Sequence, residues 1–299
     1  MDNFTGILTI IVPVYNEAQI LSDVAPRIVD LCEQNQWQVI FVNDGSQDGS
    51  REILAGFAGS ANVQIIHHKV NKGYGGAIKS GIRAVTTPFL VTIDADGQHN
   101  LEDVSVLLNF ALEQDADMVV GNRGQSGDIN PYRAIGKRII RLFTRMLMPL
   151  PIRDLNSGFK LYRTDLAQKY ISVCPNSMAF SDVITLIFVN QRNLVLEHPI
   201  TVTPRRVGKS TINTYTAFET VLEILNIVLM FDPLRIFMPV AIFCISIGLA
   251  WGTIILFVVG RGVSVGAMLA IVTGLIFFIL GLLANQISAM RMENLQKDS

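Results

Sequence analysis

Acidic side chains follow three short apolar runs of the chain at the points where those runs end. Glu17 follows the first run, Asp44 the second, and Asp94 and Asp96 a later one. Asp94 and Asp96 are two residues apart, so both carboxylates can point to the same side of an extended chain. Converging carboxylates favour a hard cation such as Mg²⁺, which keeps positions open for water and substrate phosphates. The pattern therefore predicts a site for a metal ion and a nucleotide diphosphate.

The elements that must position these carboxylates alternate in type along the first 200 residues. Short runs rich in β-branched residues predict strands, and longer amphipathic runs between them predict helices. The predicted strands cover residues 8–14, 39–42, 63–67, 89–93 and 118–120, and the predicted helices cover residues 18–34, 50–58, 75–84 and 101–114. This order predicts an α/β fold, a mostly parallel sheet flanked by helices. In such sheets ligands bind beyond the carboxyl ends of the strands, where the acidic residues lie.

Two long uncharged stretches, 236–260 and 263–290, follow this region. Each exceeds the roughly 20 residues that a helix needs to cross a bilayer. Only Arg261 and Gly262 separate them, which predicts a transmembrane hairpin with both ends on one side. Basic residues flank the ends more than the turn, and no signal peptide is apparent, so we expect the ends and the catalytic domain in the cytoplasm. Two buried core helices are the alternative, although both stretches are longer than core helices usually are.

The composition agrees with a membrane-attached chain. Of 299 residues, 50% are hydrophobic and 16% are charged, against roughly 25% charged residues in a typical soluble protein. The formal net charge of -1 argues against nucleic acid as a partner. Three widely spaced cysteines show no zinc or redox spacing, so a metal would be held by oxygen ligands.

A basic amphipathic helix is predicted over residues 131–148. Apolar residues fall on one helical face, and basic residues recur every four positions on the other. This pattern is typical of a helix lying in a membrane interface. A helix packed on the protein core with a solvated outer face is the alternative. A second apolar-rich helix, at about 215–231, would lead into the hairpin.

Other motifs have structural alternatives to a functional role. The four histidines show no ligand spacing to one another, and only His99 is close to the acidic motif. The segment 73–76, Gly-Tyr-Gly-Gly, is either a flexible start of a helix or a loop beside the predicted nucleotide-diphosphate site. Asp182 precedes a predicted helix over 183–190, so it could cap this helix as well as act in catalysis.

Five short motifs occur in a fixed order along the chain. They are Pro13-Val14-Tyr15-Asn16-Glu17, Asn43-Asp44-Gly45-Ser46, Asp94-Ala95-Asp96-Gly97-Gln98, Gly121-Asn122-Arg123 and Asn156-Ser157-Gly158-Phe159-Lys160. This set resembles the family 2 glycosyltransferases of GT-A fold. More narrowly, it is similar to the polyprenyl-phosphate glycosyltransferases, meaning dolichyl-phosphate mannose synthase and bacterial undecaprenyl-phosphate glucosyltransferases. The resemblance covers residues 8 to about 215, and the residues 233–235 before the hairpin resemble the bacterial members. Asn43 replaces an aspartate that is common in the family, while Asp44 keeps the neighbouring carboxylate.

The resemblance implies a role for each matching residue. The nucleotide sugar would be bound by Pro13, Tyr15, Glu17, Val42, Asp44, Asp94 and Ala95. Mg²⁺ or Mn²⁺ would be held by Asp94, Asp96 and Gln98. The acceptor phosphate would be met by Arg123, Ser157 and a basic residue among Arg133, Lys137 and Arg138. Arg206 or Lys209 would close over the donor diphosphate. The implied catalytic residues are Asp96, Arg123, Arg206 and Lys209.

The implied reaction is inverting transfer of a hexose to a membrane polyprenyl phosphate, undecaprenyl or dolichyl, which gives a β-linked phosphosugar. UDP-glucose is slightly favoured as the donor, and GDP-mannose comes next. A phosphate acceptor is already mostly dianionic near neutral pH, so no strong base is required. The implied partners are the nucleotide sugar, the polyprenyl phosphate and membrane lipid, and a homo-oligomer is compatible with the anchored relatives.

Two other functions stay open at this point. One is an anchored GT-A enzyme that acts on a glycan or glycolipid hydroxyl, and the other is a membrane-tethered nucleotide-sugar binding protein without catalysis. For the domain organisation we expect a cytoplasmic catalytic domain over 1–213, a juxtamembrane helix over 214–235, two transmembrane helices over 236–290 and a cytoplasmic tail over 291–299.

Overall fold

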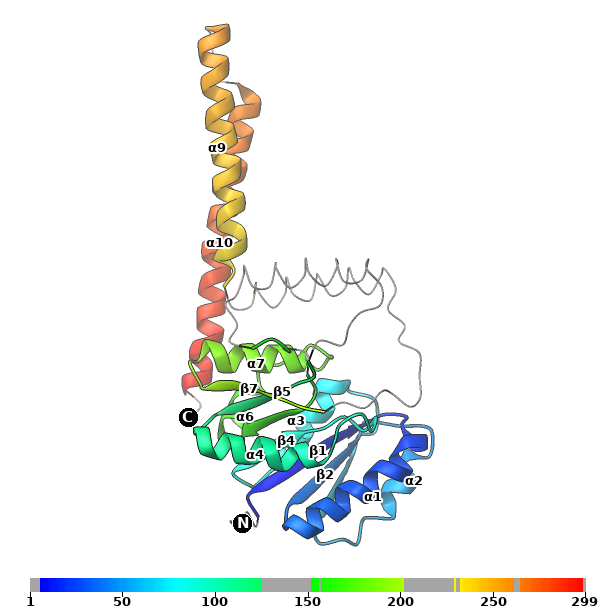
Figure 1. Cartoon of the computed structure of the whole chain (residues 1–299). Coiled ribbons are helices and arrows are strands. Elements are labelled where there is room, and N and C mark those ends of the chain that lie inside the picture. The colour runs from blue at the N-terminus through cyan, green and yellow to red at the C-terminus, as the bar shows by residue number, and fades with distance from the viewer. Residues whose placement is uncertain are drawn as a thin grey trace. The chain divides into compact units, whose positions relative to one another are not determined.

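The computed structural model describes residues 6–124, 152–155, 157–201, 229, 232–260 and 264–297 (Figure 1). Contacts between these residues separate two units. The first contains the described residues up to 201, and the second contains the two C-terminal helices. The predicted interfacial helix over 131–148 lies outside the described residues. The predicted helix at about 215–231 does so too, apart from residue 229.

The first unit is built on a seven-stranded sheet (Figure 1). Its strands are β1 (Leu8–Val14), β2 (Gln38–Asn43), β3 (Val63–His67), β4 (Phe89–Thr92), β5 (Met118–Asn122), β6 (Lys160–Arg163) and β7 (Val195–Pro199). Their order across the sheet is β3-β2-β1-β4-β6-β5-β7. Only β6 is antiparallel to its neighbours, β4 and β5. The other described strands therefore all end at one edge of the sheet, and β6 begins there.

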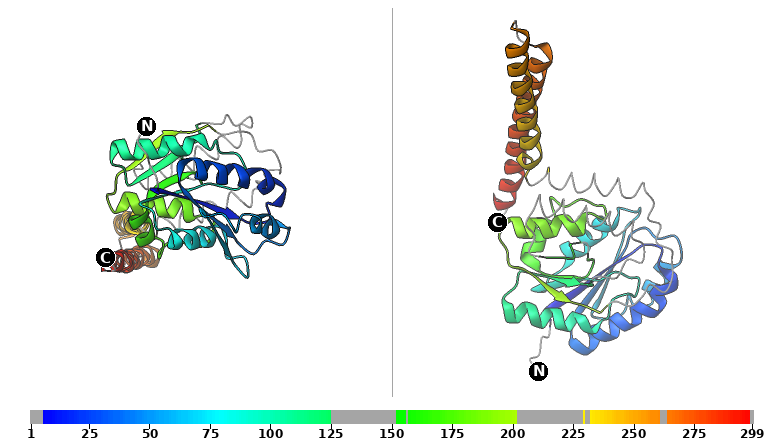
Figure 2. Two further views of the ribbon diagram at one scale, coloured as in Figure 1. Left: turned by 90° about the horizontal axis from the view of Figure 1, so that it is seen from below. Right: turned by 45° about the horizontal axis from the view of Figure 1, so that its top comes forward.

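Helices cover both faces of this sheet (Figure 2). One face carries α1 (Ala18–Asn35), α2 (Ser50–Ala55) and α4 (Glu102–Gln114), and the other carries α3 (Tyr74–Ala84), α6 (Thr164–Tyr170) and α7 (Phe180–Asn190). Alternating side chains of β1 serve the two layers, as expected for a strand buried on both faces. Ile10 and Val12 share a core cluster with α1 and α4, whereas a β-carbon at Gly81 of α3 would touch Ile11.

The five strands predicted from the sequence are all present, with ends that differ by at most two residues. Two strands, β6 and β7, and one helix, α6, were not predicted from the sequence. In β6, Lys160 and Arg163 flank only two apolar residues, and β7 contains Glu197, His198 and Pro199, so neither shows a strand pattern. The helix expected over 183–190 begins earlier, at Phe180. Asp182 therefore lies in the first turn of α7 and does not precede the helix.

The second unit consists of α9 (Leu234–Val259) and α10 (Val265–Lys297). The stretches Leu234–Val258 and Val265–Met290 are long and apolar enough to cross a membrane, and only 11% and 17% of their most apolar windows are buried. This exposure differs from that of core helices and agrees with the predicted hairpin. The helices pack closely, because a β-carbon at Gly248 would lie 2.8 Å from the Ala267 carbonyl oxygen.

Candidate active site at the carboxyl edge of the sheet

The first carboxylate after β4, that of Asp94, is held from two sides. The Tyr74 hydroxyl, at the start of α3, donates a hydrogen bond to Asp94 Oδ1 over 3.0 Å. On the other side, a β-carbon at Gly158 would collide with Asp94 Oδ2, so only glycine fits there. Burial, together with the charge of Asp94, raises the pKa of Tyr74 well above its ordinary value, so this phenol stays a neutral donor. Tyr74 and Gly158 thus fix the direction of the carboxylate.

Asp96 and Gln98 complete a donor set that suits a hard cation. Asp96 Oδ1 accepts the Gln98 backbone N–H over 3.1 Å. Asp94 and Asp96 are both partly exposed. Within the described ranges, no three His, Cys, Asp or Glu side chains cluster around a common metal position. By their chemistry, two carboxylates and an amide oxygen suit a Mg²⁺ or Mn²⁺ that shares its other positions with a diphosphate and water. Metal binding by Asp94, Asp96 and Gln98 stays a prediction.

His99 lies beneath the acidic loop. Its side chain is 5% exposed, and its Nε2 is 3.8 Å from Asp94 Oδ2. The imidazole packs on Phe159 with ring centroids 5.1 Å apart. Its buried Nδ1 has no hydrogen-bond partner among the described residues. As expected from the sequence, His99 lies close to the acidic motif, next to Asp94.

The loops after β1 and β2 are joined by hydrogen bonds. Asn16, with φ of 54°, donates its backbone N–H to Ser46 Oγ over 3.0 Å. Asp48 Oδ2 accepts the Ala18 N–H at the start of α1 over 2.8 Å. These contacts fix the backbone that follows Tyr15, a residue that is 49% exposed. An exposed aromatic ring at this edge can stack on a nucleobase.

Asp44, at the end of β2, is almost fully buried and firmly held. Its Oδ1 accepts hydrogen bonds from His68 Nδ1 at 2.6 Å and from the Lys72 backbone N–H at 2.9 Å. His68 Nε2 in turn lies 2.9 Å from Ser80 Oγ. The side chains of His68 and Asp44 are each 4% exposed. One oxygen of Asp44 is thus used inside the protein, and this fixes where the other oxygen, Oδ2, points.

The other residues predicted for the nucleotide sugar lie at or just below the same edge. Pro13 and Glu17 are partly exposed. Val42 and Ala95 are 0% and 4% exposed, so their side chains belong to the core at the base of the loops. Contacts of these four residues with a nucleotide stay predictions.

Arg123 follows β5 directly and forms an ion pair with Asp154. Arg123 Nε donates to Asp154 Oδ2 over 2.8 Å, and Nη2 donates to Oδ1 over 2.9 Å. The Arg123 backbone N–H also donates to Oδ2, over 3.2 Å. The hydrogen bonds with Asp154 raise the pKa of Arg123, and the charges of Asp94 and Asp182 act in the same direction. Burial alone would raise the pKa of Asp154, but its bonds with Arg123 outweigh that effect and lower it.

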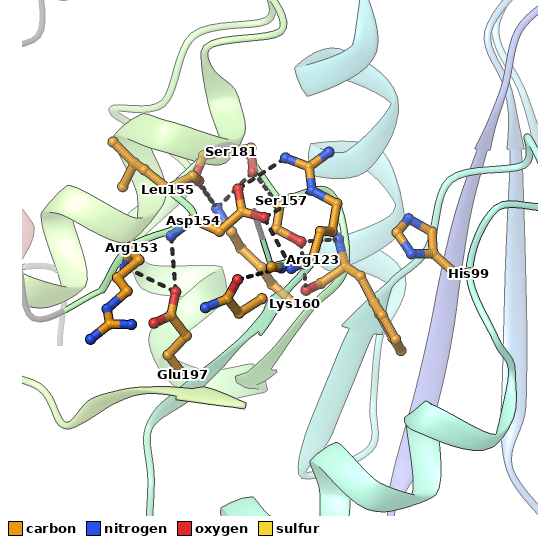
Figure 3. A network of polar contacts seen from close by, with 12 residues as sticks. His99, Arg123, Arg153, Asp154, Leu155, Ser157, Lys160, Ser181 and Glu197 are labelled. Atoms are coloured by element: carbon orange, nitrogen blue, oxygen red, sulfur yellow. Dashed lines mark hydrogen bonds and ion pairs between the residues drawn. The ribbon is translucent and has the colours of Figure 1, made fainter. Parts of the chain in front are cut away.

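The segment that carries Asp154 is supported by two strands (Figure 3). Glu197 of β7 accepts the backbone N–H groups of Arg153 and Asp154 on its Oε1, each over 2.9 Å. Lys160 of β6 donates to the Leu155 carbonyl oxygen over 2.7 Å. Arg123 therefore contacts a segment that is itself fixed to the sheet.

The remaining predictions concern the phosphates. Ser157 is fully buried, and its Oγ accepts the Phe159 N–H over 3.3 Å, so its predicted contact with the acceptor stays a prediction. The other predicted phosphate-binding residues lie outside the described residues, and they are Arg133, Lys137, Arg138, Arg206 and Lys209.

The residues that form hydrogen bonds with the predicted site residues were not identified from the sequence. Tyr74, His68 and Asp154 are 20, 24 and 31 positions away from the partners that they hold, so no local spacing shows these pairs. Two motifs did contain a signal. Tyr74 interrupts the glycines of the 73–76 segment, and Lys160 is a charged residue at the start of a strand in the core.

Two relatives match more than two thirds of this chain. Polyprenol monophosphomannose synthase of Mycolicibacterium smegmatis is 28% identical over 228 residues, which cover 72% of this chain and 84% of the relative. Undecaprenyl-phosphate 4-deoxy-4-formamido-L-arabinose transferase of Sodalis glossinidius is 28% identical over 207 residues, which cover 68% of this chain and 62% of that enzyme. Both names combine a polyprenol, a phosphate and a sugar.

A solved structure shows the same fold. Glucosyl-3-phosphoglycerate synthase from Mycobacterium tuberculosis, solved with Mn²⁺, UDP and phosphoglyceric acid, aligns with a TM-score of 0.58 at 16% identity. The alignment covers 74% of this chain and 78% of that one. The predicted GT-A fold is thereby confirmed. A structure of that enzyme with Mg²⁺ and UDP aligns with a TM-score of 0.56.

Family models match both units. Residues 232–290 match the GtrB C-terminal hairpin, which covers most of α9 and α10. Residues 9–171 match glycosyl transferase family 2, and they hold the acidic loop, Arg123 and the segment around Asp154. Since this match extends over more than half of the chain, the protein belongs to glycosyl transferase family 2.

Proposed function

We propose that this enzyme transfers a hexose, with inversion, from a nucleotide-diphosphate sugar to a membrane polyprenyl phosphate. One observation carries the proposal: Asp94 and Arg123 follow β4 and β5 at the same edge of the sheet, and only β6 lies between these two strands. A cation suited to one phosphate thus lies beside carboxylates suited to a metal-bound diphosphate. The names of the relatives and the apolar hairpin support a polyprenyl phosphate as the acceptor.

The chemistry asks little of the protein beyond positioning. An acceptor phosphate oxygen forms a bond to the anomeric carbon while the bond from that carbon to the diphosphate oxygen breaks, and the nucleoside diphosphate leaves with the electron pair. The acceptor is already an anion, so no side chain has to remove a proton. Asp94, Asp96 and Gln98 would hold the divalent ion, which supplies charge neutralisation at the departing diphosphate.

The donor is proposed on narrower grounds. Asp44 Oδ2 could accept an N–H of uracil or of guanine, so the buried Asp44–His68 pair suits either base. UDP-glucose is our first candidate because of the resemblance to bacterial two-span enzymes. GDP-mannose is the second, favoured by the similarity to polyprenol monophosphomannose synthase. For the membrane arrangement we propose two spans, with the catalytic domain over 1–213 in the cytoplasm and the tail over 291–299 on the same side.

A product assay tests the proposal. The purified full-length protein is given undecaprenyl phosphate, Mg²⁺ or Mn²⁺ and a panel of nucleotide sugars, and the lipid product is identified by mass spectrometry. We expect one phosphosugar, and we expect Asp96→Ala to abolish it. Asp165→Asn is the matched control, because Asp165 lies at the opposite edge of the sheet in an exposed pair with Arg163. A sugar found only on a glycan hydroxyl, or nucleotide-sugar binding without transfer, would overturn the proposal.

A further inference from the structure

We propose that Asp154 is a positioning residue that holds one edge of the Arg123 guanidinium so that the opposite edge faces the acceptor phosphate. This inference rests on the proposed function, which supplies the phosphate. It adds a residue that touches neither substrate, and it explains why an arginine that should bind an anion is already paired with one.

The first argument is the number of donors on Arg123. A guanidinium carries five N–H groups in one rigid plane. Asp154 takes one from Nε and one from Nη2, at 2.8 and 2.9 Å. Among the described residues, no partner accepts a hydrogen bond from Nη1 or a second one from Nη2. Because the group is planar, fixing the Nε edge also fixes this second edge, which can bind two phosphate oxygens at once.

The second argument is the exposure of the guanidinium and its place at the edge of the sheet. The Arg123 side chain is 39% exposed, whereas the Asp154 side chain is 17% exposed. The pair is therefore sheltered on the carboxylate side and more open on the guanidinium side. Arg123 follows β5 and Asp94 follows β4, and only β6 lies between these strands, so Arg123 lies at the same edge of the sheet as the acidic loop. An anion on the open edge would lie beside the donor.

The third argument is the support of Asp154 itself. Its own N–H and that of Arg153 both donate to Glu197 Oε1, and the carbonyl oxygen of the next residue, Leu155, accepts from Lys160. The backbone around Asp154 is thus bonded to β7 on one side and to β6 on the other (Figure 3). A carboxylate held in this way can orient a long side chain that would otherwise sample many rotamers.

Lys160 is the strongest part of this support. It is fully buried, and its Nζ contacts the Leu155 carbonyl, the Ser181 carbonyl, Ser181 Oγ and Thr185 Oγ1 at 2.6 to 2.8 Å. No carboxylate accepts a hydrogen bond from it among the described residues. A buried ammonium without a paired carboxylate is costly. The presence of Lys160 at this buried position, despite this cost, agrees with a role in fixing the segment at Leu155.

Positioning of this kind has a cost that makes it testable. Asp154 cancels part of the positive charge of Arg123, so a protein that needed only attraction for phosphate would bind better without Asp154. If geometry matters more, removing Asp154 weakens the contact with the acceptor, since small misplacements of a positioned group can cost about 100-fold. The two cases predict changes of opposite sign.

The experiment compares Asp154→Ala and Asp154→Asn with the wild type in the full-length protein. For both variants we expect the acceptor KM to rise, by about 10- to 100-fold for alanine and by less for asparagine, which keeps one acceptor oxygen. Affinity for the nucleotide sugar and the pH profile of transfer should not change, because Asp154 neither binds the nucleotide sugar nor removes a proton in the reaction. In an Arg123→Ala background, Asp154→Ala should add little.

Two controls separate positioning from misfolding. Asp165→Asn breaks another Arg–Asp pair of the same unit, that of Arg163 and Asp165 at 2.7 Å, and should leave the acceptor KM unchanged. The thermal unfolding midpoints of all variants are measured alongside. An unchanged or lower acceptor KM in Asp154→Ala, or effects that simply add in the double variant, would overturn the inference.

A binding measurement keeps this test apart from that of the proposed function. Farnesyl phosphate is titrated into the wild type and Asp154→Ala by calorimetry in the presence of UDP, so that no transfer is needed. We expect affinity at least 10-fold weaker in the variant. Equal affinities would refute positioning by Asp154 even if transfer occurs. Absence of transfer in the wild type, with this difference still present, would refute only the proposed reaction.

Discussion

Lys160 shows how one buried charge connects the sheet to the active site. Burial lowers the pKa of Lys160 from its ordinary value to about 8. In the unfolded chain a lysine keeps its proton up to a pH of about 10.4. Between these two values the unfolded state binds more protons than the folded state, so the contribution of Lys160 to stability rises with pH in this window.

This difference predicts the behaviour of Lys160→Met. The variant loses a partner for the Leu155, Ser181 and Thr185 oxygens and should be less stable than the wild type at every pH. The gap between the two unfolding midpoints should widen from pH 7 to pH 10, because only the wild type gains stability from this titration. Thermal unfolding of both proteins across this range measures the gap. A gap that stays constant would show that Lys160 has an ordinary pKa.

The residue types at the site were largely predictable from the sequence. The residues that hold them in place by hydrogen bonds were not. Arg123 follows β5 directly, and Asp94 and Asp96 come within four residues of the end of β4, so a β-branched run followed by such a residue is visible in the sequence. Tyr74, His68 and Asp154 owe their roles to contacts over 20 or more positions. The sheet order creates these contacts, and the order cannot be read from local spacing.

At the scale of elements, the start of α3 is seated on the segment that leads into α7. Gly73 has φ of 86°, and the Gly76 N–H donates to the Asn176 carbonyl oxygen over 3.2 Å. A β-carbon at Gly75 would lie 2.5 Å from the Pro175 carbonyl oxygen and 2.7 Å from Phe180 Cβ. This close approach brings Tyr74 to Asp94.

Gly75→Ala should therefore disturb both stability and the acidic loop. Overpacking of this kind costs about 1 to 3 kcal/mol, and the displaced helix start would pull the Tyr74 hydroxyl away from Asp94. We expect a lower urea midpoint and weaker Mn²⁺ binding in the presence of UDP, measured by electron paramagnetic resonance. Gly59→Ala is the control, since nothing lies within 4 Å of a β-carbon there. Equal stability of the two variants would contradict the packing argument.

The elements also show where sequence patterns fail. β1, β2, β4 and β5 are mostly apolar and buried, as expected for strands covered on both faces, and β3 keeps three β-branched residues. All five were predicted. β6 has Lys160 at its first position, and this residue is buried only because four oxygens surround its ammonium group. A pattern of apolar residues cannot anticipate a buried lysine. The same limit hid the antiparallel direction of this strand.

At the scale of the whole molecule, the hairpin and the catalytic unit have different tasks. α9 and α10 expose large apolar side chains along most of their length, such as Phe257 and Leu283. A lipid acceptor stays in the bilayer, so an anchored enzyme meets it at a high effective concentration.

Removal of the hairpin tests whether α9 and α10 serve only to anchor the catalytic unit to the membrane. A chain that ends after Asp232 should keep the unfolding midpoint of its catalytic unit. Its turnover on undecaprenyl phosphate in liposomes should fall at least 10-fold, because the search for the acceptor is no longer confined to the membrane. Turnover on soluble farnesyl phosphate should change little. Equal turnover of both chains on the liposomes would contradict a role for the anchor.

The reversed direction of β6 has one further consequence. Gly121 of β5 donates its N–H to the Phe159 carbonyl oxygen over 3.0 Å, so the chain leaves the sheet and returns to it at adjacent points. The closure entropy of such a connection grows only slowly with its length. The pairing of β5 with β6 depends on the hydrogen bonds of the two strands themselves. We therefore expect chimaeras that exchange the residues between Gly124 and Ile152 for those of a relative to keep the register of the sheet.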